Sequence, residues 1–569
     1  MSLSTSPKSN TAVTLQQLIE TSGNDRDRQS HSLTQALTTL ISTYSSQLPK
    51  AKTSIAHIPF EQFRLDSRQL AASDVFVLLK SQTPNCQKSR DYLYQSAEQA
   101  AFILSEIDPI ALLSTASVPP HANTSFTNDS DRSKAQQQLA ALPCPVVYVP
   151  NIRDFLGDLI QARLQHQQPV TLPTVVAVTG TNGKTTISQL VAQLTQLTGM
   201  SSAVMGTAGN GRLGALVQAS HTTGDALAVQ QFLYQMGHEK AQLLALEASS
   251  HGLDQQRLQG MPVSVAIYTN LSRDHLDYHA DMAEYAAAKA KLFDKAHFPE
   301  LTHAIINIDD EHAQIMLDTA HASGLTVWSY SLDPAKSATF VAADIKPSLQ
   351  GVEIALRTDF KNKETKSINI ISPLLGRFNV ANLLAAIAAA VALGISLERI
   401  ADVIPQLQGA VGRMQRVPSA NGCFIVDYAH TPDALSQVLA SLKTHCKGQL
   451  WAVFGCGGDR DAGKRPLMAQ AGLAGADKVV LTADNPRTED PNLILQDMQA
   501  GMTSEQYQRT HIEPARQTAI EYAVKQAAPA DIVVIAGKGH ETYQEINHVR
   551  YDFDDSVILQ HALKQAGRL

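Results

Sequence analysis

An apolar run that ends in a glycine-rich turn and passes directly into a helix-like segment constrains this chain more than any other feature. Residues 174–180 read TVVAVTG, a continuous apolar and β-branched run typical of a buried parallel strand. Residues 187–199, ISQLVAQLTQLTG, then repeat apolar side chains at helical spacing. A strand, a glycine turn and a helix in this order predict a phosphate-binding unit in an α/β fold.

The turn itself reads GTNGKTT over residues 180–186. Its backbone N–H groups and the helix N-terminus make an anion cradle, in which Lys184 would reach the outer phosphates of ATP and Thr185 would meet Mg²⁺. Val178 stands where the common P-loop pattern has its first glycine, so this loop is a shortened form. The predicted ATP contacts in the loop are Gly180, Thr181, Asn182, Gly183, Lys184, Thr185 and Thr186.

The rest of the chain continues the alternation of strands and helices. Its 569 residues predict about three domains. Apolar runs separated by helical patterns predict mostly parallel sheets covered by helices, and they lie at 75–79, 146–150, 243–248, 265–270, 303–309, 423–429, 450–455, 478–484 and 531–537. Residues 379–394 predict a helix, and a new unit begins near Gly412. We expect residues 1–12 to be disordered and residues 114–138 to form a surface insertion.

Charge, hydropathy and cysteine usage exclude several function classes. A formal net charge of −7 does not attract polyanions, which argues against nucleic acid as a partner. The chain has neither an apolar run of about 18 residues nor a signal-peptide core, so we expect no membrane partner and a cytoplasmic location. The cysteines are scattered without paired spacing, which argues against a disulfide framework or a zinc site; they are Cys86, Cys144, Cys423, Cys446 and Cys456.

Two further groups of polar residues follow predicted strands of the phosphate-binding unit. Glu247 lies at the end of the 243–248 run, where an acidic metal ligand usually sits beside a phosphate loop. Asp274, His275, Asp277 and His279 crowd the loop after the 265–270 run. Oxygen ligands with one imidazole suit Mg²⁺ or Mn²⁺. We favour a metal role for His275 and ordinary loop capping for His279.

A series of motifs, in chain order, resembles the Mur ligase family. These motifs are GTNGKTT, EASSHGLDQQR (247–257), YTNLSRDHLDYHADM (268–282), LLGRFNVANLLAA (374–386), VDYAHTPDAL (426–435), FGCGGDRDAGKRPLM (454–468), DNPRTEDP (484–491) and GKGHE (537–541). The resemblance is strong over residues 170–569 and weak over residues 60–105.

The resemblance implies three domains: a small N-terminal α/β uridine-binding domain at 1–170, a central P-loop ATPase domain with a mostly parallel sheet at 171–411, and a C-terminal, amino-acid-binding Rossmann-like domain at 412–569. It also implies peptidoglycan precursor synthesis. In this family ATP phosphorylates the carboxylate of UDP-N-acetylmuramoyl-L-alanyl-D-glutamate, and an amine then attacks the acyl phosphate.

The same resemblance assigns metal and nucleotide contacts. Thr185 and Glu247 would hold one Mg²⁺, and His275 would help to hold a second. Lys289 matches a lysine that is carbamylated in the family, a change that converts a cation into a metal-bridging anion. Read alone, Lys289 is a solvated helix lysine. The implied contacts to the adenine and the rest of the nucleotide are Asn379, Arg416, Asp427, Tyr428 and His430.

Two substrate sites follow in the same way. For the uridine and the muramoyl dipeptide the matching residues are Leu65, Ser67, Thr222, Thr223, Ser249, Gln255 and Arg257. The segment LDSR that contains Leu65 and Ser67 is equally readable as a plain surface turn, and His221 stands where the family often has Asn. Arg257 is suited to pair bidentately with a carboxylate.

The amine substrate is indicated by DNPR, a form that goes with meso-diaminopimelate in the family. The predicted contacts are Arg460, Asp484, Asn485, Pro486, Arg487, Gly537 and Glu541. Diaminopimelate has a second carboxylate that Arg487 can hold with two hydrogen bonds, whereas lysine has none. The alternative is that Arg487 only staples its own turn.

Several other functions remain open from the sequence. They are the same ligase chemistry with lysine, a folylpolyglutamate synthase-like ligase, a P-loop ATPase or switch that only hydrolyses nucleotide, and a catalytically silent nucleotide-binding protein. The expected partners are UDP-N-acetylmuramoyl dipeptide, meso-diaminopimelate and ATP, and we expect a monomer.

Overall fold

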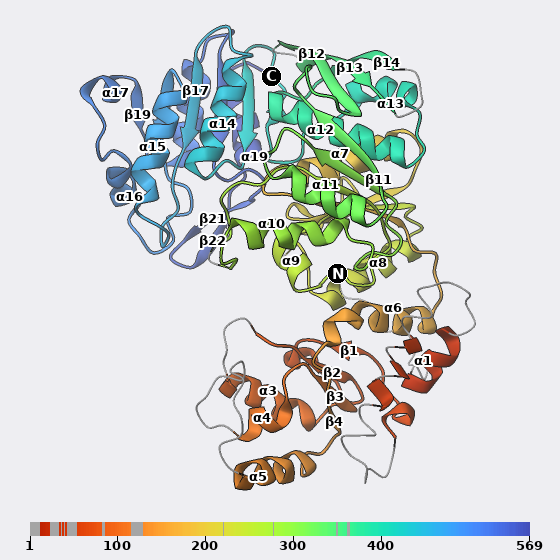
Figure 1. Cartoon of the computed structure of the whole chain (residues 1–569). Helices are drawn as coiled ribbons and strands as arrows, with labels where there is room; N and C mark the ends of the chain where they lie inside the picture. The colour runs from red at the N-terminus through yellow and green to blue at the C-terminus, as the bar shows by residue number, and fades with distance from the viewer. Residues whose placement is uncertain are drawn as a thin grey trace.

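Three sheets, each covered by helices, follow one another along the chain in the computed structural model (Figure 1). The structure describes residues 12–22, 34–35, 37–38, 40–42, 54–81, 86–114, 129–219, 221–276, 278–348, 351–360 and 365–569. The predicted disorder of residues 1–12 therefore lies, apart from residue 12, outside the described residues. So does most of the predicted insertion at 114–138, of which residues 129–138 belong to a largely exposed helix.

The N-terminal sheet is small and entirely parallel, with the order β1-β2-β3-β4. Its strands are β1 (Phe63–Arg64), β2 (Val75–Leu78), β3 (Phe102–Ser105) and β4 (Val146–Tyr148). Every residue of β2 and β3 is buried, which confirms the strand predicted at 75–79. The helices around it are α1 (Leu15–Ser22), α3 (Cys86–Ala97), α4 (Pro109–Ser114), α5 (Asp129–Ala140) and α6 (Leu156–Gln167), with single turns η1 (Ile55–His57), η2 (Ser67–Gln69) and η3 (Ile152–Asp154).

The central sheet has ten strands in the order β14-β13-β12-β11-β10-β9-β5-β8-β6-β7. Parallel strands β5 (Thr174–Thr179), β8 (Leu243–Glu247), β9 (Val263–Tyr268) and β10 (His303–Asn307) confirm predicted runs, whereas the parallel strands β6 (Ser202–Gly206) and β11 (Thr326–Ser331) were not predicted. Antiparallel strands extend both edges: β7 (Gly209–Gly211) at one, and β13 (Gly351–Thr358) and β14 (Lys366–Ser372) beyond β12 (Phe340–Ser348) at the other. The sequence analysis did not predict β12–β14, where buried and exposed residues alternate as in a sheet with one solvated face.

Helices cover both faces of the central sheet. Core residues of α7 (Lys184–Leu197) and α12 (Arg377–Ala392) pack on one face, together with α13 (Leu397–Val403) and η5 (Ile404–Gln406). On the other face lie α8 (Ala226–His238), α9 (Ser250–Asp254), α10 (Met282–Ala290), η4 (Lys291–Phe293) and α11 (Ala313–Ala322). The position of α12 confirms the helix predicted at 379–394.

The C-terminal sheet has the order β15-β16-β20-β17-β18-β19, and only β15 runs antiparallel. Its strands are β15 (Gln415–Val417), β16 (Cys423–Asp427), β17 (Leu450–Phe454), β18 (Lys478–Leu481), β19 (Thr510–Ile512) and β20 (Ile532–Ala536). One face is covered by α14 (Pro432–Lys443), α15 (Lys464–Gly475) and α16 (Pro491–Met498), and the other by α18 (Arg516–Gln526) and α19 (Asp555–Gln565). The short helix α17 (Ser504–Gln508) and the hairpin β21 (Tyr543–Ile546) and β22 (Val549–Asp552) complete this part.

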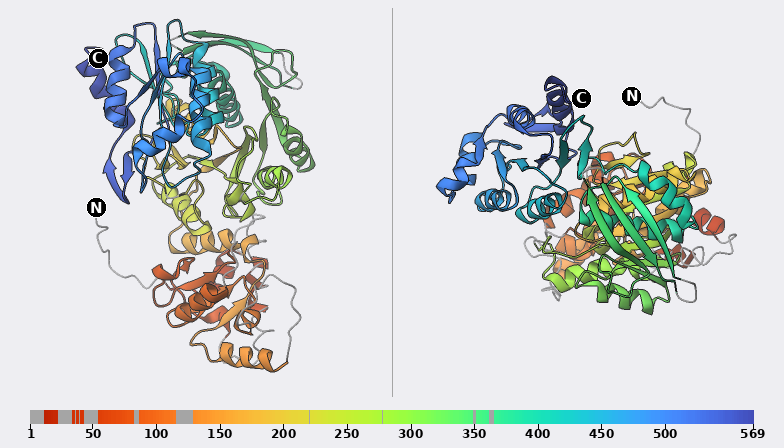
Figure 2. Two further views of the ribbon diagram at one scale, coloured as in Figure 1. Left: turned by 90° about the vertical axis from the view of Figure 1, so that its left-hand side faces the viewer. Right: turned by 90° about the horizontal axis from the view of Figure 1, so that it is seen from above.

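The N-terminal part lies below the central part, and the C-terminal part lies beside it (Figures 1 and 2). Gln259 Nε2 donates to Asp158 at 2.6 Å across the first junction, and the backbone N–H of Gly376 donates to His445 Nε2 at 3.1 Å across the second. We retain the domain boundaries 170/171 and 411/412 as proposals. Among the described helices, none combines the length and apolar character that crossing a membrane requires.

Candidate active site

The phosphate loop lies between β5 and α7, as predicted. Gly180 and Gly183 have positive φ values of 145° and 90°, and a Cβ at Gly180 would lie 1.8 Å from Thr269 Oγ1. Glycine is therefore required there by both conformation and space. Lys184 folds back over the loop, and its Nζ donates to the carbonyl oxygens of Gly180 and Thr181 at 2.9 and 2.8 Å. The loop thus has the shape of an anion cradle with a lysine over its mouth.

Glu247 lies at the base of this loop, at the end of β8. Its Oε1 accepts hydrogen bonds from the Thr185 hydroxyl at 2.9 Å and from the Thr207 backbone N–H at 2.8 Å. A Cβ on the adjacent Gly206 would lie 2.1 Å from that same oxygen. Hydroxyl and carboxylate oxygens suit Mg²⁺, which takes one or two protein ligands and completes its shell with phosphate and water. Thr185 and Glu247 fit that role, although no group of three or more metal-binding side chains gathers anywhere in the described part of the chain.

Lys289, predicted as a metal-bridging residue, is buried on α10. Its Nζ donates at 2.8 Å to Gly180 O, the carbonyl that Lys184 also contacts, and lies 4.5 Å from the ring centroid of Tyr285. Burial and the neighbouring Lys184 charge hold the pKa of Lys289 well below its usual value. Burial also lowers the pKa of Lys184, and Arg413 adds to this effect while Glu247 opposes it. The reading of Lys289 as a solvated helix lysine is therefore wrong.

The histidines after β9 belong to a cluster of rings. His275 has a positive φ of 54°, its side chain is 44 % exposed, and its Nε2 lies 3.5 Å from Asp274 Oδ2. Its ring centroid lies 4.9 Å from that of His251 and 6.1 Å from that of Tyr285, the ring that Lys289 also contacts. Asp277 lies outside the described residues.

His279 differs from the prediction of a loop cap. Its ring is buried 5.1 Å from the Tyr285 centroid, and neither ring nitrogen has a hydrogen-bond partner among the described residues. Burial lowers the pKa of His279, which favours the neutral ring. His279 is therefore part of the packing under the cluster.

The residues predicted to hold the muramoyl dipeptide come together beside Glu247. Thr223 Oγ1 donates to Glu247 O at 2.8 Å and accepts from the Ser249 N–H at 3.0 Å. Arg257 donates to Thr223 O at 3.0 Å and twice to Gln255 Oε1, at 3.0 and 2.8 Å. Burial lowers the pKa of Arg257. Thr222 joins the group through Thr207, since their hydroxyl oxygens lie 3.0 Å apart.

Leu65 and Ser67 lie apart from that group, in the N-terminal part. Ser67 begins the turn η2, which Asp66 caps by accepting the Arg68 N–H at 3.0 Å. Arg68 also pairs with Asp66 at 2.7 Å and is largely exposed. This is the geometry of a capped surface turn, and the uridine role of Leu65 and Ser67 remains a prediction.

Asn379 and Asp427 lie on either side of the junction between the central and C-terminal parts. Asn379 Nδ2 donates to Leu375 O at 2.8 Å and its Oδ1 accepts from Asn382, whose own Oδ1 would lie 2.6 Å from a Cβ on Gly183. Asp427 is buried and accepts from the backbone N–H groups of Met414 and Ala429 at 2.7 and 2.8 Å. Burial raises the pKa of Asp427, against the opposing effect of Arg413.

The structure does not bring Arg416 into this group. Its side chain is exposed on β15, and its charge acts on Cys423, whose pKa burial raises to about 11. Arg413, which the sequence analysis missed, lies 4.6 Å above the Tyr428 ring, and the Tyr428 and His430 rings are 4.6 Å apart. GRMQR offers two arginines three residues apart, and strand geometry alone does not select between them.

The predicted amine contacts lie at the carboxyl ends of β18 and β20. Asn485 Nδ2 donates to Glu541 Oε2 at 2.9 Å, and the buried Lys538, missed from the sequence, donates to Asn485 Oδ1 at 3.1 Å and to Glu541 Oε2 at 3.2 Å. Gly537 abuts Asp484, because a Cβ at Gly537 would lie 2.6 Å from Asp484 Oδ2.

Arg487 and Arg460 both lie near Gly457, where a Cβ would be 2.9 Å from Arg487 NH1 and 3.7 Å from Arg460 Cγ. Arg487 has a φ of 51° and follows Pro486, and its NH1 donates to Gly458 O at 2.7 Å in the neighbouring loop. Its Nε lies 3.7 Å from Glu545 Oε2. The Arg487 side chain therefore bonds to a neighbouring loop and does not only stabilise its own turn. Arg460 is exposed in the 455–463 loop.

A phosphate-type loop after β5, and charged side chains gathered at the carboxyl ends of β18 and β20, are consistent with an ATP-dependent acid–amino-acid ligase. Residues 178–390 match the Mur ligase middle domain, and residues 412–539 match the Mur ligase, glutamate ligase domain. The UDP-N-acetylmuramoyl-L-alanyl-D-glutamate--2,6-diaminopimelate ligase of Vibrio vulnificus is 38 % identical over 511 residues, 90 % of this chain and 95 % of the relative. The Pseudomonas aeruginosa protein of that name is 46 % identical over 390 residues, 68 % of this chain and 77 % of the relative.

This chain belongs to the Mur ligase family. A solved structure of a UDP-N-acetylmuramoyl-L-alanyl-D-glutamate--2,6-diaminopimelate ligase aligns with a TM-score of 0.67 at 42 % identity, and covers 93 % of this chain and 99 % of that one. A folylpolyglutamate synthase from Mycobacterium tuberculosis aligns with a TM-score of 0.53 at 17 % identity over 68 % of this chain, and it shares the fold alone.

Proposed function

We propose that this protein adds meso-2,6-diaminopimelate to UDP-N-acetylmuramoyl-L-alanyl-D-glutamate with hydrolysis of ATP to ADP and phosphate, in peptidoglycan precursor synthesis. Relatives that are 38–46 % identical have this activity in their names. The observation that carries the proposal is that one cationic and one anionic side chain, Arg487 and Glu541, belong to the loops at the carboxyl ends of β18 and β20. Arg487 suits the distal carboxylate of the diamino acid and Glu541 suits an ammonium group, whereas lysine offers Arg487 nothing to bind.

The first step is phosphoryl transfer from ATP to the glutamyl carboxylate of the UDP-linked dipeptide. The loop from Gly180 to Thr186 positions the phosphates, and Lys184 neutralises charge as the γ-phosphoryl group moves. Arg257, which donates to Thr223 O, is proposed to hold the dipeptide, because its guanidinium can pair with a carboxylate. Thr185 and Glu247 would hold Mg²⁺, which when bound supplies further charge neutralisation. The products are an acyl phosphate and ADP.

The second step is amide formation. The unprotonated amine of diaminopimelate attacks the acyl carbon, the carbon–oxygen bond to phosphate breaks, and inorganic phosphate leaves with that electron pair. The amine loses its proton as the amide forms. The role of the C-terminal pocket is to hold the amine in line with the acyl carbon. Because the phosphate loop and this pocket belong to different domains, we further propose that the domains close during turnover.

The remaining assignments follow from the substrates. ATP and nucleotide-linked sugars are cytoplasmic metabolites, so we propose that the enzyme acts there, as a monomer. His275 and a carbamylated Lys289 are proposed to help bind a second Mg²⁺, because both side chains contact Tyr285 beside the phosphate loop.

Phosphate release tests the proposed function. The enzyme is incubated with ATP, Mg²⁺ and UDP-N-acetylmuramoyl-L-alanyl-D-glutamate, alone and with meso-diaminopimelate, L-lysine or L-glutamate. We expect release that depends on both the UDP-linked dipeptide and diaminopimelate, with the tripeptide product identified by mass spectrometry. Release that ignores added amino acid would indicate a hydrolase, and release driven by lysine would overturn the proposed specificity. A folate acceptor with glutamate tests the folylpolyglutamate alternative.

A further inference from the structure

A buried arginine, Arg516, contacts the chain where both predicted amine-binding loops begin, and the proposed reaction steps do not use it. Arg516 begins α18, and its side chain is 0 % exposed. It pairs through two hydrogen bonds with Asp555, the first residue of α19: Nε lies 2.8 Å from Oδ1, and NH2 lies 2.7 Å from Oδ2. Such a pair fixes the plane of the guanidinium group, so its remaining donors point in set directions.

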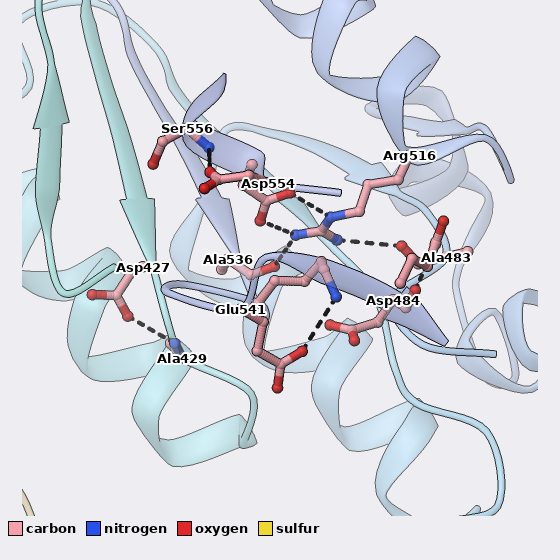
Figure 3. A network of polar contacts seen from close by, with 12 residues as sticks. Asp427, Ala429, Ala483, Asp484, Arg516, Ala536, Glu541, Asp554 and Ser556 are labelled. Atoms are coloured by element: carbon pink, nitrogen blue, oxygen red, sulfur yellow. Dashed lines mark hydrogen bonds and ion pairs between the residues drawn. The ribbon is translucent and has the colours of Figure 1, made fainter. Parts of the chain in front are cut away.

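Those remaining donors hold the chain at the base of both amine-binding loops. NH1 donates to Ala483 O at 3.3 Å, and NH2 donates to Ala536 O at 3.0 Å. Ala483 immediately precedes the 484–487 loop, and Ala536 immediately precedes the 537–541 loop. Figure 3 shows Asp484 and Glu541 on the side of the Arg516 guanidinium away from Asp554, with the bonded carbonyl groups of Ala536 and Ala483 on either side of that guanidinium. One side chain therefore contacts the starting point of each loop.

The sheet itself does not connect these two loops. β18 and β20 are separated by β17, and the hydrogen-bonded ladder reaches only Phe454–Leu481 on one side and Val453–Ile535 on the other. Ala483 and Ala536 lie beyond those pairs. Arg516 therefore bridges the ends of β18 and β20 at a level where the ladder bonds of β17 to these two strands have stopped, although Ala536 still pairs with Asp427 of β16.

The loops also touch one another at this point. A Cβ on Gly537 would lie 2.6 Å from Asp484 Oδ2 and 3.9 Å from Arg516 NH2. Burial opposes the charge on Arg516, but Asp555 outweighs it and raises the pKa of the guanidinium, with Asp484 and Glu541 adding to the effect. The Arg516 guanidinium is thus permanently charged. A small displacement of this group would change the distance between the two loops.

We propose that Arg516, anchored by Asp555, is a positioning residue for the amine substrate. It sets the spacing between the loop that carries Arg487 and the loop that carries Glu541, and so the fit of the diamino acid between them. The inference rests on the proposed function and adds to it a residue that does not touch the substrate.

The test is Arg516→Lys, which keeps the charge but cannot make the two-pronged pair and both carbonyl bonds. We expect the KM for meso-diaminopimelate to rise roughly 10- to 100-fold, as misplacement of about 1 Å can do. The KM for ATP should stay within about twofold, and so should acyl-phosphate formation without amine, trapped by borohydride reduction. Asp555→Asn should shift the same KM in the same direction by a smaller factor, and it decides the question if Arg516→Lys does not fold.

The matched control is Asp531→Asn, at the opposite ends of the same strands. Asp531 is buried and accepts from Trp451 Nε1 at 3.1 Å and from the Gln449 N–H at 2.8 Å. This variant should lower the melting temperature of the protein and leave the KM for diaminopimelate unchanged. The proposal is overturned if Arg516→Lys and Asp555→Asn leave that KM unchanged, or if acyl-phosphate formation falls as far as amide formation does. If wild-type turnover is itself independent of diaminopimelate, the proposed function fails and this inference fails with it.

Discussion

Replacement of Arg487 by alanine should selectively weaken the use of diaminopimelate. Truncation of one partner in a buried, hydrogen-bonded charge pair costs about 2–5 kcal/mol. The Arg487 side chain is 21 % exposed, and Glu545 lies 3.7 Å from its Nε. Water and that carboxylate both reduce what a substrate carboxylate gains, so we expect the lower end, about 2–3 kcal/mol, or a loss of roughly 30- to 150-fold in kcat/KM.

The assay compares two amines that differ at the atom group in question. kcat/KM is measured for meso-diaminopimelate and for L-lysine in wild type, Arg487→Ala and Arg487→Lys. Lysine has no distal carboxylate, so its kcat/KM should change by less than about threefold. Arg487→Lys should lie between wild type and alanine, because it keeps the charge but loses the fork. An equal loss for both amines would refute the reasoning, since it would mean that Arg487 supports the pocket through Gly458 rather than binding the substrate.

Three further changes test the phosphate side of the site. Glu247→Gln should lower kcat by roughly two orders of magnitude, with a higher Mg²⁺ requirement in a titration; unchanged Mg²⁺ dependence would contradict its metal role. Gly206→Ala should give a similar loss, because its Cβ would lie 2.1 Å from Glu247 Oε1; full activity would mean that this carboxylate can move freely. Lys289→Met should inactivate the enzyme yet stabilise it at neutral pH, measured by urea unfolding between pH 7.5 and 10.5 in bicarbonate-free buffer. As pH falls below 10.5, Lys289 binds a proton in the unfolded wild type but not in the folded state. The free energy of unfolding of the wild type therefore drops until the lowered pKa of Lys289 is reached, and it is constant below that pH. Parallel curves for the two proteins would contradict this sign.

Apolar runs, glycine turns and helical periodicity predicted the strands and helices that neighbouring residues determine. β5 and α7 lie where an apolar run is followed by a glycine turn and a helical period, and β16, β17, β18 and β20 also lie in predicted apolar runs. β12–β14 were not predicted. Whether a short alternating run such as 351–358 forms a strand depends on which of its faces the rest of the protein covers. The phosphate loop was likewise readable, since its chemistry is contained in consecutive residues.

The residues that sequence reasoning missed act through distant partners. Arg516 meets Asp555 across 39 positions, and Lys538 meets Asn485 across 53. Which of Arg413 and Arg416 lies near Tyr428 depends on the direction that the chain takes around Met414, whose φ is 46°. None of these relations leaves a local periodicity, and only the folded sheet brings the partners to one edge.

The two lysines beside the phosphate loop give the clearest case of charge suited to an anionic ligand. Lys184 and Lys289 donate to the same carbonyl oxygen, and each lies in surroundings that lower its pKa. Such crowding of cations costs stability in the free protein. It becomes favourable once ATP brings several negative charges to the loop, because the repulsion is then replaced by attraction. A lowered pKa also favours the unprotonated form of the Lys289 amine, which is the form that reacts with carbon dioxide to give a carbamate. The same burial that makes Lys289 an unstable cation therefore favours the carbamylation proposed for it.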